Sequence, residues 1–373
     1  MRLDGGVPRP SRPGAAPVHF RAMATFEIQP RGPFHLSAAA DFAGGFAPGL
    51  GGHGPGVSRG LLMAFPLEDW RSSAAVDLWQ EPDGTIRGEV AGTDDEHAAS
   101  AQAARSLSLD HDGSGWVEVG HRDAVIGRLQ EQYDFLRPVC FYSAYEAATS
   151  LVIGQRIAMR QGAAVKRRLA DERGDAIEIG GETVHAFPRP QRLLEADSVP
   201  GISAEKVRRL HGLAQAALDG KLDTQSLRSL PEEEALARLA ELPGVGPWTA
   251  QGILMRGCGP TDSMPTEDAI SRQAVAWAYE LPEPPDDAAW LRISETWRPY
   301  RMWATVLLHM AWRRAQPGTP SYRQGPGTRG PLPESSPRTR DTPCPRGQSG
   351  EARPRRTTKC GRNASRCSSR PSR

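Results

Sequence analysis

A glycine-containing turn and an aspartate downstream of it are the residues of this chain best suited to chemistry. The turn reads Leu242-Pro243-Gly244-Val245-Gly246-Pro247-Trp248-Thr249-Ala250, and Asp268 follows it. Gly244 and Gly246 can take positive φ and let another backbone approach closely, while Pro247 is pre-set for the first turn of a helix. Unpaired amides at the positive end of that helix suit one phosphate group.

The turn joins two expected helices, 235–241 and 248–255, within a helix-hairpin-helix segment at 235–256. A Pro-Gly-x-Gly turn between two helices is also compatible with a plain αα-hairpin that binds no ligand. The longer string, from Leu242 to Ala250, is far more restrictive and favours a hairpin that binds DNA.

This string is the helix-hairpin-helix signature, and with Asp268 it resembles the DNA glycosylases of the helix-hairpin-helix superfamily. Other segments resemble motifs of the DNA-3-methyladenine glycosylase II family. They are Ile153-Gly154-Gln155, Phe187-Pro188-x-Pro190 with Leu193, Ala204-Glu205-Lys206 and Trp297-Arg298-Pro299-Tyr300-Arg301. The similarity is strong over about 104–315, whereas over 24–103 only the layout is shared.

The resemblance implies that the protein holds a bent, opened duplex, flips one base out and fills the gap with a side chain. The residues expected to contact DNA are Gly244, Val245, Gly246, Thr249, Gln155 and Arg156. Arg156 stands where this family inserts its wedge. Ile157 is the alternative wedge, and Arg156 is then a surface residue near a helix end.

Asp268 is the candidate catalytic residue that the resemblance implies. As the base departs, the sugar acquires oxocarbenium character, and a nearby carboxylate lowers that barrier and can position water. The segment Pro265-x-x-Asp268-x-x-x-Arg272 matches the family pattern. Glu267 is the alternative, and either carboxylate could merely stabilise the first turn of a helix capped by Thr266.

Trp248 bears on both the reaction type and the base pocket. In bifunctional relatives a lysine stands immediately before the Thr-Ala of the hairpin and forms a Schiff base with the sugar. Here that position is Trp248, so the resemblance implies a monofunctional enzyme. Its aromatic face suits a cationic alkylated purine through stacking and cation–π attraction, and the alternative is a tryptophan packed in the core.

The pocket departs from the family at two positions. Relatives place a tyrosine four residues after this tryptophan, where the chain has Gly252. His309 falls where another pocket aromatic is expected, and Trp303 or Trp312 would need a shifted alignment to replace it. We therefore expect a roomier or less aromatic pocket, which leaves the lesion range open.

The amino-terminal part of the chain predicts a small antiparallel sheet. Short apolar or alternating runs are typical of strands, and they occupy 25–28, 34–36, 61–67, 76–79 and 85–90. The turn Pro82-Asp83-Gly84 joins the last two runs.

From about Glu96 onward the apolar spacing predicts helices. They cover 123–131, 143–153, 163–170, 190–196, 204–218, 231–241, 248–255, 266–278, 285–296 and 300–313. The expected fold class is α+β, with a small amino-terminal antiparallel β domain followed by a two-lobed all-helical glycosylase body. The predicted divisions are a disordered extension (1–22), the β-rich domain (23–103), the helical body (104–315) and a disordered basic tail (316–373), and Met23 could be the true start.

The net charge of +2 hides an asymmetry along the chain. Residues 316–373 hold thirteen Lys or Arg against three acidic residues, a net charge of +10, so the first 315 residues carry about −8. DNA contacts in the folded part must therefore come from local amides and a few cations. Without a long apolar run or a hydrophobic signal core, we expect a soluble cytoplasmic monomer with no membrane partner, nucleoid-associated if bacterial.

The cysteines bear on possible cofactors. Relatives such as endonuclease III hold an iron–sulfur cluster with four closely spaced cysteines near the carboxyl end. Of the five cysteines here, Cys360 and Cys367 echo one interval of that pattern without the other ligands. We predict no cluster, no catalytic metal and no redox cofactor. Hairpin carbonyls of this superfamily often hold a monovalent cation, so the resemblance leaves open whether the hairpin of this chain binds one.

The expected function is hydrolytic removal of alkylated bases, of the 3-methyladenine type, from double-stranded DNA in base excision repair. One alternative is a glycosylase for another lesion class, such as an oxidised or deaminated base. The other is a catalytically silent relative that uses the hairpin only as a phosphate clamp.

Overall fold

The structure is a computed structural model that describes residues 24–46, 60–266 and 268–316. The predicted extension 1–22 and the predicted tail beyond Gln316 lie outside the described residues. Glu267 and the three cysteines of the tail (Cys344, Cys360 and Cys367) also lie outside them.

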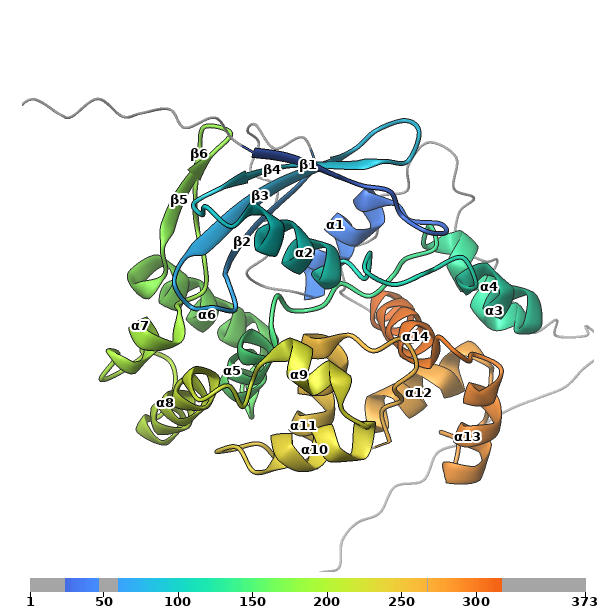
Figure 1. Cartoon of the computed structure of the whole chain (residues 1–373). Helices are drawn as coiled ribbons and strands as arrows, with labels where there is room; N and C mark the ends of the chain where they lie inside the picture. Colours follow the sequence, from blue (N-terminus) through green and yellow to red (C-terminus); the bar gives the residue numbers. More distant parts are fainter. Residues whose placement is uncertain (1–23, 47–59, 267, 317–373) are drawn as a thin grey trace, which may run out of the picture. The chain divides into compact units, whose positions relative to one another are not determined.

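A four-stranded antiparallel sheet forms from the amino-terminal residues (Figure 1). Its strands are β1 (Ala24–Ile28), β2 (Leu61–Pro66), β3 (Ser73–Gln80) and β4 (Ile86–Ala91), in the order β1-β4-β3-β2. The predicted turn between β3 and β4 is present, with Gly84 at φ +91° and the Asp83 carboxylate accepting from the Thr85 amide at 2.9 Å. The predicted strands at 25–28, 61–67, 76–79 and 85–90 are confirmed.

The strand predicted at 34–36 is wrong, because Leu36 begins helix α1 (Leu36–Phe46). Three alternating residues are too few to separate a strand from a helix. The following residues decide it, since Leu36, Ala39, Ala40 and Ala43 are buried at the i, i+3, i+4, i+7 spacing of one helix face. Alanine is also the strongest helix former.

The body predicted to be all-helical contains a β-hairpin, formed by β5 (Ala176–Ile179) and β6 (Glu182–His185). This hairpin was not predicted, although Gly180 (φ +58°) and Gly181 (φ +84°) supply the two positive-φ residues that a tight hairpin turn requires. Ile177 and Ile179 pack with Leu62 of β2 and Ala75 of β3. The hairpin therefore covers the side of the sheet opposite the one that faces the main core.

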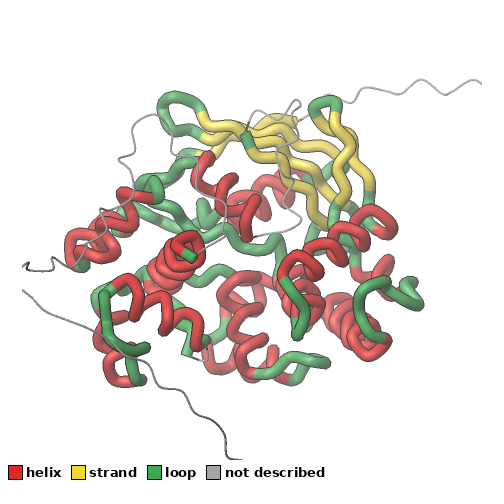
Figure 2. The backbone as a smooth tube through the Cα atoms, turned by 180° about the vertical axis from the view of Figure 1, so that it is seen from behind, coloured by secondary structure: helices red, strands yellow, loops and turns green. Residues whose placement is uncertain are grey.

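The rest of the described chain is helical (Figure 2). The helices are α2 (Glu96–Ser106), α3 (Trp116–Arg122), α4 (Ala124–Gln132), α5 (Ala144–Gly154), α6 (Met159–Arg173), α7 (Pro190–Leu194), α8 (Ala204–Leu218), α9 (Thr224–Ser229), α10 (Glu232–Ala240), α11 (Pro247–Ile253), α12 (Ala269–Ala278), α13 (Asp287–Glu295) and α14 (Arg301–Ala315). A π-helical turn (Leu254–Cys258) continues α11. Each predicted helix is present, whereas α2, α3 and α9, like α1, lie outside the predicted helix ranges. No helix of the described part is long and apolar enough to cross a membrane.

Two hydrophobic cores organise these elements. The first joins the sheet with α1–α4 and with α12–α14 at the other end of the described chain. The second is built by α5–α11. An ion pair of 2.6 Å between Asp110, which follows α2, and Arg228 of α9 links the two.

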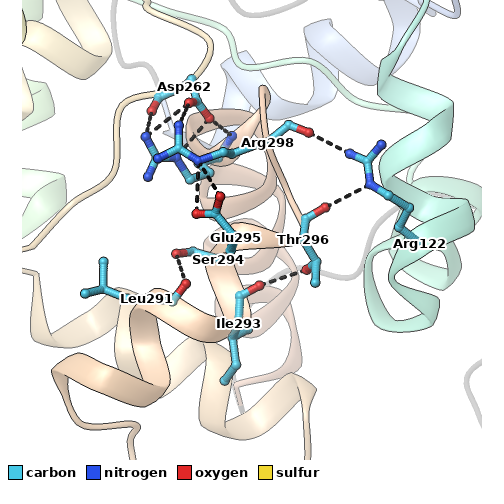
Figure 3. A network of polar contacts seen from close by, with 9 residues as sticks. Arg122, Asp262, Leu291, Ile293, Ser294, Glu295, Thr296 and Arg298 are labelled. Carbon is cyan, nitrogen blue, oxygen red and sulfur yellow. Dashed lines mark hydrogen bonds and ion pairs between the residues drawn. The ribbon is translucent and has the colours of Figure 1, made fainter.

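A polar network fixes the turn from α13 into α14 (Figure 3). Asp262 accepts from Arg298 at 2.6 Å and from Arg301 Nε at 2.9 Å. Arg122, at the end of α3, donates to the Arg298 carbonyl at 2.6 Å and to the Thr296 carbonyl at 3.3 Å. The arginines of the Trp-Arg-Pro-Tyr-Arg motif thus set where α14 begins, and α14 carries His309.

Candidate functional site

The glycine turn is a tight connection between α10 and α11. Gly244 has φ +78°, so its backbone takes the left-handed conformation that favours glycine. Gly246 does not share this requirement, because it caps α11 with φ −94° and ψ 179°. The expectation of positive φ is therefore met at Gly244 alone. A Cβ atom on Gly246 would meet no atom within 4 Å, so its surface is open to a partner.

The amides at the start of α11 fit a phosphate. The first hydrogen bond into this helix runs from the Ala250 amide to the Gly246 carbonyl at 2.8 Å. Among the residues that the structure describes, none accepts from the amides of Gly246, Trp248 or Thr249. Thr249 is only 5% exposed, so its hydroxyl is poorly placed to meet a ligand.

Gln155 ties the end of α5 to the hairpin. Its side-chain amide donates to the Gly244 carbonyl at 2.9 Å, and its oxygen accepts from Arg209 at 3.4 Å. Lys206 donates to the Ile153 carbonyl at 2.9 Å, where a cation stabilises the negative end of α5. Gln155 therefore holds the hairpin in place rather than standing free on the surface.

Arg156 is exposed and has φ +56°, an uncommon conformation for a residue with a side chain. Such conformations persist where the surrounding structure imposes them and concentrate at functional sites. Ile157, the alternative wedge, is partly buried and packs against the second core. Burial leaves Ile157 poorly placed to enter DNA, and Arg156 projects from the loop instead.

Asp268 is the residue that caps α12. Its Oδ1 accepts from the Ile270 amide at 3.2 Å and its Oδ2 accepts from Ser271 Oγ at 2.6 Å. The predicted start of this helix at Thr266 is wrong, because Asp268 itself provides the cap. Both oxygens are fixed, so the orientation of the carboxylate is set by the protein.

Gln251 links the hairpin to Asp268. It lies in α11, three residues after Trp248, and is buried. Its side-chain amide donates to the Met264 carbonyl at 3.0 Å and reaches Thr266 Oγ1 at 3.3 Å. The helix that presents Trp248 is therefore bonded to the loop that leads into Asp268.

Two side chains of α14, His309 and Arg313, lie within electrostatic range of Asp268. α14 packs on α12, and Arg313 Nε donates to His309 Nε2 at 3.0 Å one turn away. Burial lowers the pKa of His309 to about 4, the charge of Arg313 acts in the same direction, and the carboxylate of Asp268 opposes them. Burial also lowers the pKa of Arg313, again against the charge of Asp268. At neutral pH the two side chains thus place one positive charge near the carboxylate.

Trp248 is 49% exposed at the first turn of α11. The alternative of a tryptophan packed in the core is therefore wrong. A half-exposed indole beside open amides offers an aromatic face to a planar ligand, and stacking suits any nucleobase.

Comparison with known proteins agrees with this geometry. No protein-family model matches the chain. It is 26% identical over 211 residues to a DNA-3-methyladenine glycosylase of Bacillus subtilis, covering 56% of this chain and 69% of that protein. It is 31% identical to a probable bifunctional transcriptional activator/DNA repair enzyme AlkA of Mycobacterium tuberculosis, covering 56% of this chain and 41% of that one. The solved 3-methyladenine DNA-glycosylase of Archaeoglobus fulgidus superposes with a TM-score of 0.63 at 22% identity, covering 78% of this chain and 98% of that chain.

The resemblance to the helix-hairpin-helix DNA glycosylases is confirmed. The match spans less than half of the length of the Mycobacterium protein. The likeness to the Archaeoglobus structure shows that the fold is shared.

At Gly252, where the chain departs from the glycosylase pattern, the side chain of Leu151 occupies the adjoining space. A Cβ atom there would lie 2.9 Å from Leu151 Cδ1 of α5, so a tyrosine fits only if Leu151 moves. Trp303 does not replace the missing aromatic, because it is fully buried in the first core, 4.8 Å from the Tyr300 ring. Trp312 is partly buried, with its ring 6.4 Å from that of His309.

Sequence reasoning missed Gln251 and Arg313. Gln251 follows directly after the recognised string Leu242 to Ala250, but its burial, which requires a partner for its amide, is visible only in the structure. Arg313 lies one turn after His309, so the i, i+4 spacing could have paired them.

Proposed function

We propose that the protein is a monofunctional DNA glycosylase that removes alkylated bases, of the 3-methyladenine type, from duplex DNA in base excision repair. The observation that carries this proposal is the bond from Gln251 to Met264, which joins the helix of Trp248 to the loop of Asp268. It supports a site in which an aromatic surface for a base and a fixed carboxylate belong to one unit. The relatives named above supply the lesion class.

The hairpin binds the DNA backbone in this proposal. The amides of Gly246, Trp248 and Thr249 meet one phosphate at the positive end of α11, and the open space at Gly246 lets the backbone approach. Val245 lies between the two glycines, and a monovalent cation on the hairpin carbonyls would add positive charge there. Gly244 keeps the turn tight, and Gln155 holds its carbonyl.

Base flipping requires a side chain to fill the gap that the base leaves. Arg156 is our candidate, because it is exposed on a loop with a constrained backbone, whereas Ile157 is partly buried. The flipped base then stacks on Trp248.

Asp268 acts on the sugar. The bond between C1′ and the base nitrogen breaks, and the base takes both electrons. The carboxylate stabilises the positive charge on the sugar, water forms the new bond to C1′, and its proton passes to the carboxylate. The bonds from Ile270 and Ser271 hold the carboxylate in one orientation during these steps.

The reaction stops at an abasic site, because no lysine occupies the position of Trp248. Of the three lysines in the described part, Lys166 forms a buried ion pair with Glu146 at 3.1 Å, Lys206 donates to the Ile153 carbonyl, and Lys221 is exposed after the end of α8. Lys166 and Lys206 are engaged in holding helices together, which supports hydrolysis by water rather than attack by an amine at either of them.

We also propose the layout of a β-rich domain (23–103) and a two-lobed body (104–315), supported by the two cores, and a monomer that works on DNA in the cytoplasm, nucleoid-associated if the source is bacterial. Because the first core joins the sheet with α12–α14, the β-rich domain completes one lobe in this view. The damaged base then enters between α11 and α14.

The test is release of free base from duplex DNA treated with a methylating agent. We expect 3-methyladenine in the supernatant and abasic sites in the DNA. Release of oxidised or deaminated bases alone would favour the other lesion class. Binding to DNA without release of any base would favour a catalytically silent protein.

A further inference from the structure

Arg209 of α8 lies directly against the glycine turn of the hairpin. A Cβ atom on Gly244 would come within 2.6 Å of Arg209 Cδ and within 3.3 Å of its Nε. Three residues further along α8, a Cβ atom on Gly212 would lie 2.7 Å from Pro243. The side chain of Arg209 therefore follows the surface of the turn, and close packing between α8 and the hairpin fixes its position.

The guanidinium of Arg209 lies between two segments that the proposed function assigns to DNA. Its Nη1 donates to Gln155 Oε1 at 3.4 Å, and the amide of the same Gln155 side chain donates to the Gly244 carbonyl at 2.9 Å. Arg156, the proposed wedge, follows Gln155 directly. A DNA strand that contacts both the hairpin and Arg156 would therefore pass over Arg209.

Arg209 also has hydrogen-bond donors to offer. Its side chain is 37% exposed, its Nε donates to Glu205 at 3.1 Å, and its Nη2 has no acceptor among the residues that the structure describes. Glu205 pairs with Arg208 as well, so one carboxylate balances two arginines and a positive charge remains beside the hairpin. A guanidinium with free donors suits a phosphate, which it can bind through two parallel hydrogen bonds.

We propose that Arg209 binds a second DNA phosphate, next to the one that the amides of α11 bind. The inference rests on the DNA-binding part of the proposed function and adds a further binding residue to it. Gly244, which Arg209 contacts, and Gly246 are two residues apart, at most about 7 Å, so both phosphates belong to one strand. Because the first 315 residues carry a net charge of about −8, a local cation at this point contributes affinity that the body as a whole does not supply.

The experiment measures binding of undamaged duplex DNA by the full chain over a range of salt concentrations, for wild type, Arg209→Gln, Arg209→Lys and Arg208→Gln. Each phosphate contact contributes about 0.9 to the slope of log K against log salt concentration. We expect Arg209→Gln to reduce the slope by about this amount and to weaken binding to all sequences alike. Arg209→Lys keeps the charge and should keep most of the wild-type slope.

Arg208→Gln is the matched control. It removes the other arginine that pairs with Glu205, but successive residues of a helix point about 100° apart, so Arg208 does not face the turn as Arg209 does. We expect the wild-type slope in this variant. All four proteins carry the same basic tail, so a difference in slope reports on the substituted residue.

The remaining outcomes decide against the inference. If Arg209 only holds Gln155 and Glu205 in place, Arg209→Gln lowers the urea midpoint and leaves the slope unchanged, which would overturn the phosphate contact. An equal reduction of the slope in Arg208→Gln would indicate a general effect of charge and would overturn it as well. The assay needs no catalysis: failure of the wild type to release any base would contradict the proposed glycosylase function, whereas the slopes alone decide the role of Arg209.

Discussion

The side-chain amide of Gln251 donates to the backbone carbonyl of Met264 across 3.0 Å, within the interior of the protein. This bond connects α11, which begins at the hairpin proposed to bind DNA, with the loop that ends at Asp268. If the hairpin binds a phosphate, this binding also fixes the position of the Asp268 carboxylate relative to the sugar. The proposed site therefore works as one rigid unit.

Gln251→Met tests this coupling. Methionine has a similar shape but cannot donate to Met264, so the loop before Asp268 should shift. A displacement of about 1 Å can cost about a hundredfold in rate, and we expect base release to fall about ten- to a hundredfold with nearly normal affinity for abasic DNA. Gln215→Met is the matched control, because the side chain of Gln215 is exposed and donates to the exposed Asp219 one turn later in the chain. Equal activity of the two variants would show that this bond does not position the carboxylate.

Gly246→Arg tests the hairpin. The protein should fold, because a side chain at this position points into open space and the backbone there does not require glycine. The bulk should block the phosphate and weaken binding to all DNA sequences alike, since phosphate contacts carry no base identity. The added positive charge by itself would instead strengthen binding to DNA. Fluorescence anisotropy with several duplexes shows whether the affinity falls or rises, with Gly246→Ala as control. Tighter or unchanged binding by Gly246→Arg would mean that the turn is a plain αα-hairpin.

Borohydride trapping tests the monofunctional assignment. We expect no covalent adduct with lesion-containing DNA, because Trp248 occupies the lysine position and the reaction uses water. Lys206 is the residue to examine if an adduct appears, since burial lowers its pKa. An adduct that disappears in Lys206→Gln would identify it as a nucleophile and contradict hydrolysis.

The pH dependence of stability tests the environment of His309. Its pKa is about 4 in the folded protein and 6.5 in the unfolded chain. Between these values the unfolded chain binds the extra proton, so the free energy of unfolding should decrease as the pH falls from about 6.5 to about 4. His309→Gln removes this contribution, and Asp268, Arg256 and Arg313 remain around the site. Urea midpoints at neutral and acidic pH should therefore fall less in the variant; an equal fall would mean that His309 is not held neutral.

The sequence was most informative where local physics decides the structure. The hairpin depends on glycine and proline in a fixed order, and α8 was predicted with its observed bounds because Ser203 caps it and apolar residues follow helical spacing. The start of α12 was misplaced because Thr266 and Asp268 are both good caps, and only the packed structure decides between them. The β5–β6 hairpin was overlooked among helices, although its glycines were a usable signal.

The candidate site was predictable only where short sequence motifs carry its residues. Asp268 and Trp248 stand in recognisable strings, whereas the contact of Arg313 with Met159 joins residues far apart in the sequence. Such contacts follow from how α14 packs on α12 and could not be predicted from the sequence. The same holds for the ion pairs of Asp262 that set the start of α14.

The most direct test of the account is single-turnover base release from methylated duplex DNA by wild type and Asp268→Asn. Asparagine can still cap α12, so the variant should fold and bind abasic DNA as wild type does. Loss of the transition-state charge should cost at least about 3 kcal/mol, or roughly a hundredfold in rate. The account predicts release by wild type and at least a hundredfold slower release by the variant, and equal rates for the two proteins would contradict it.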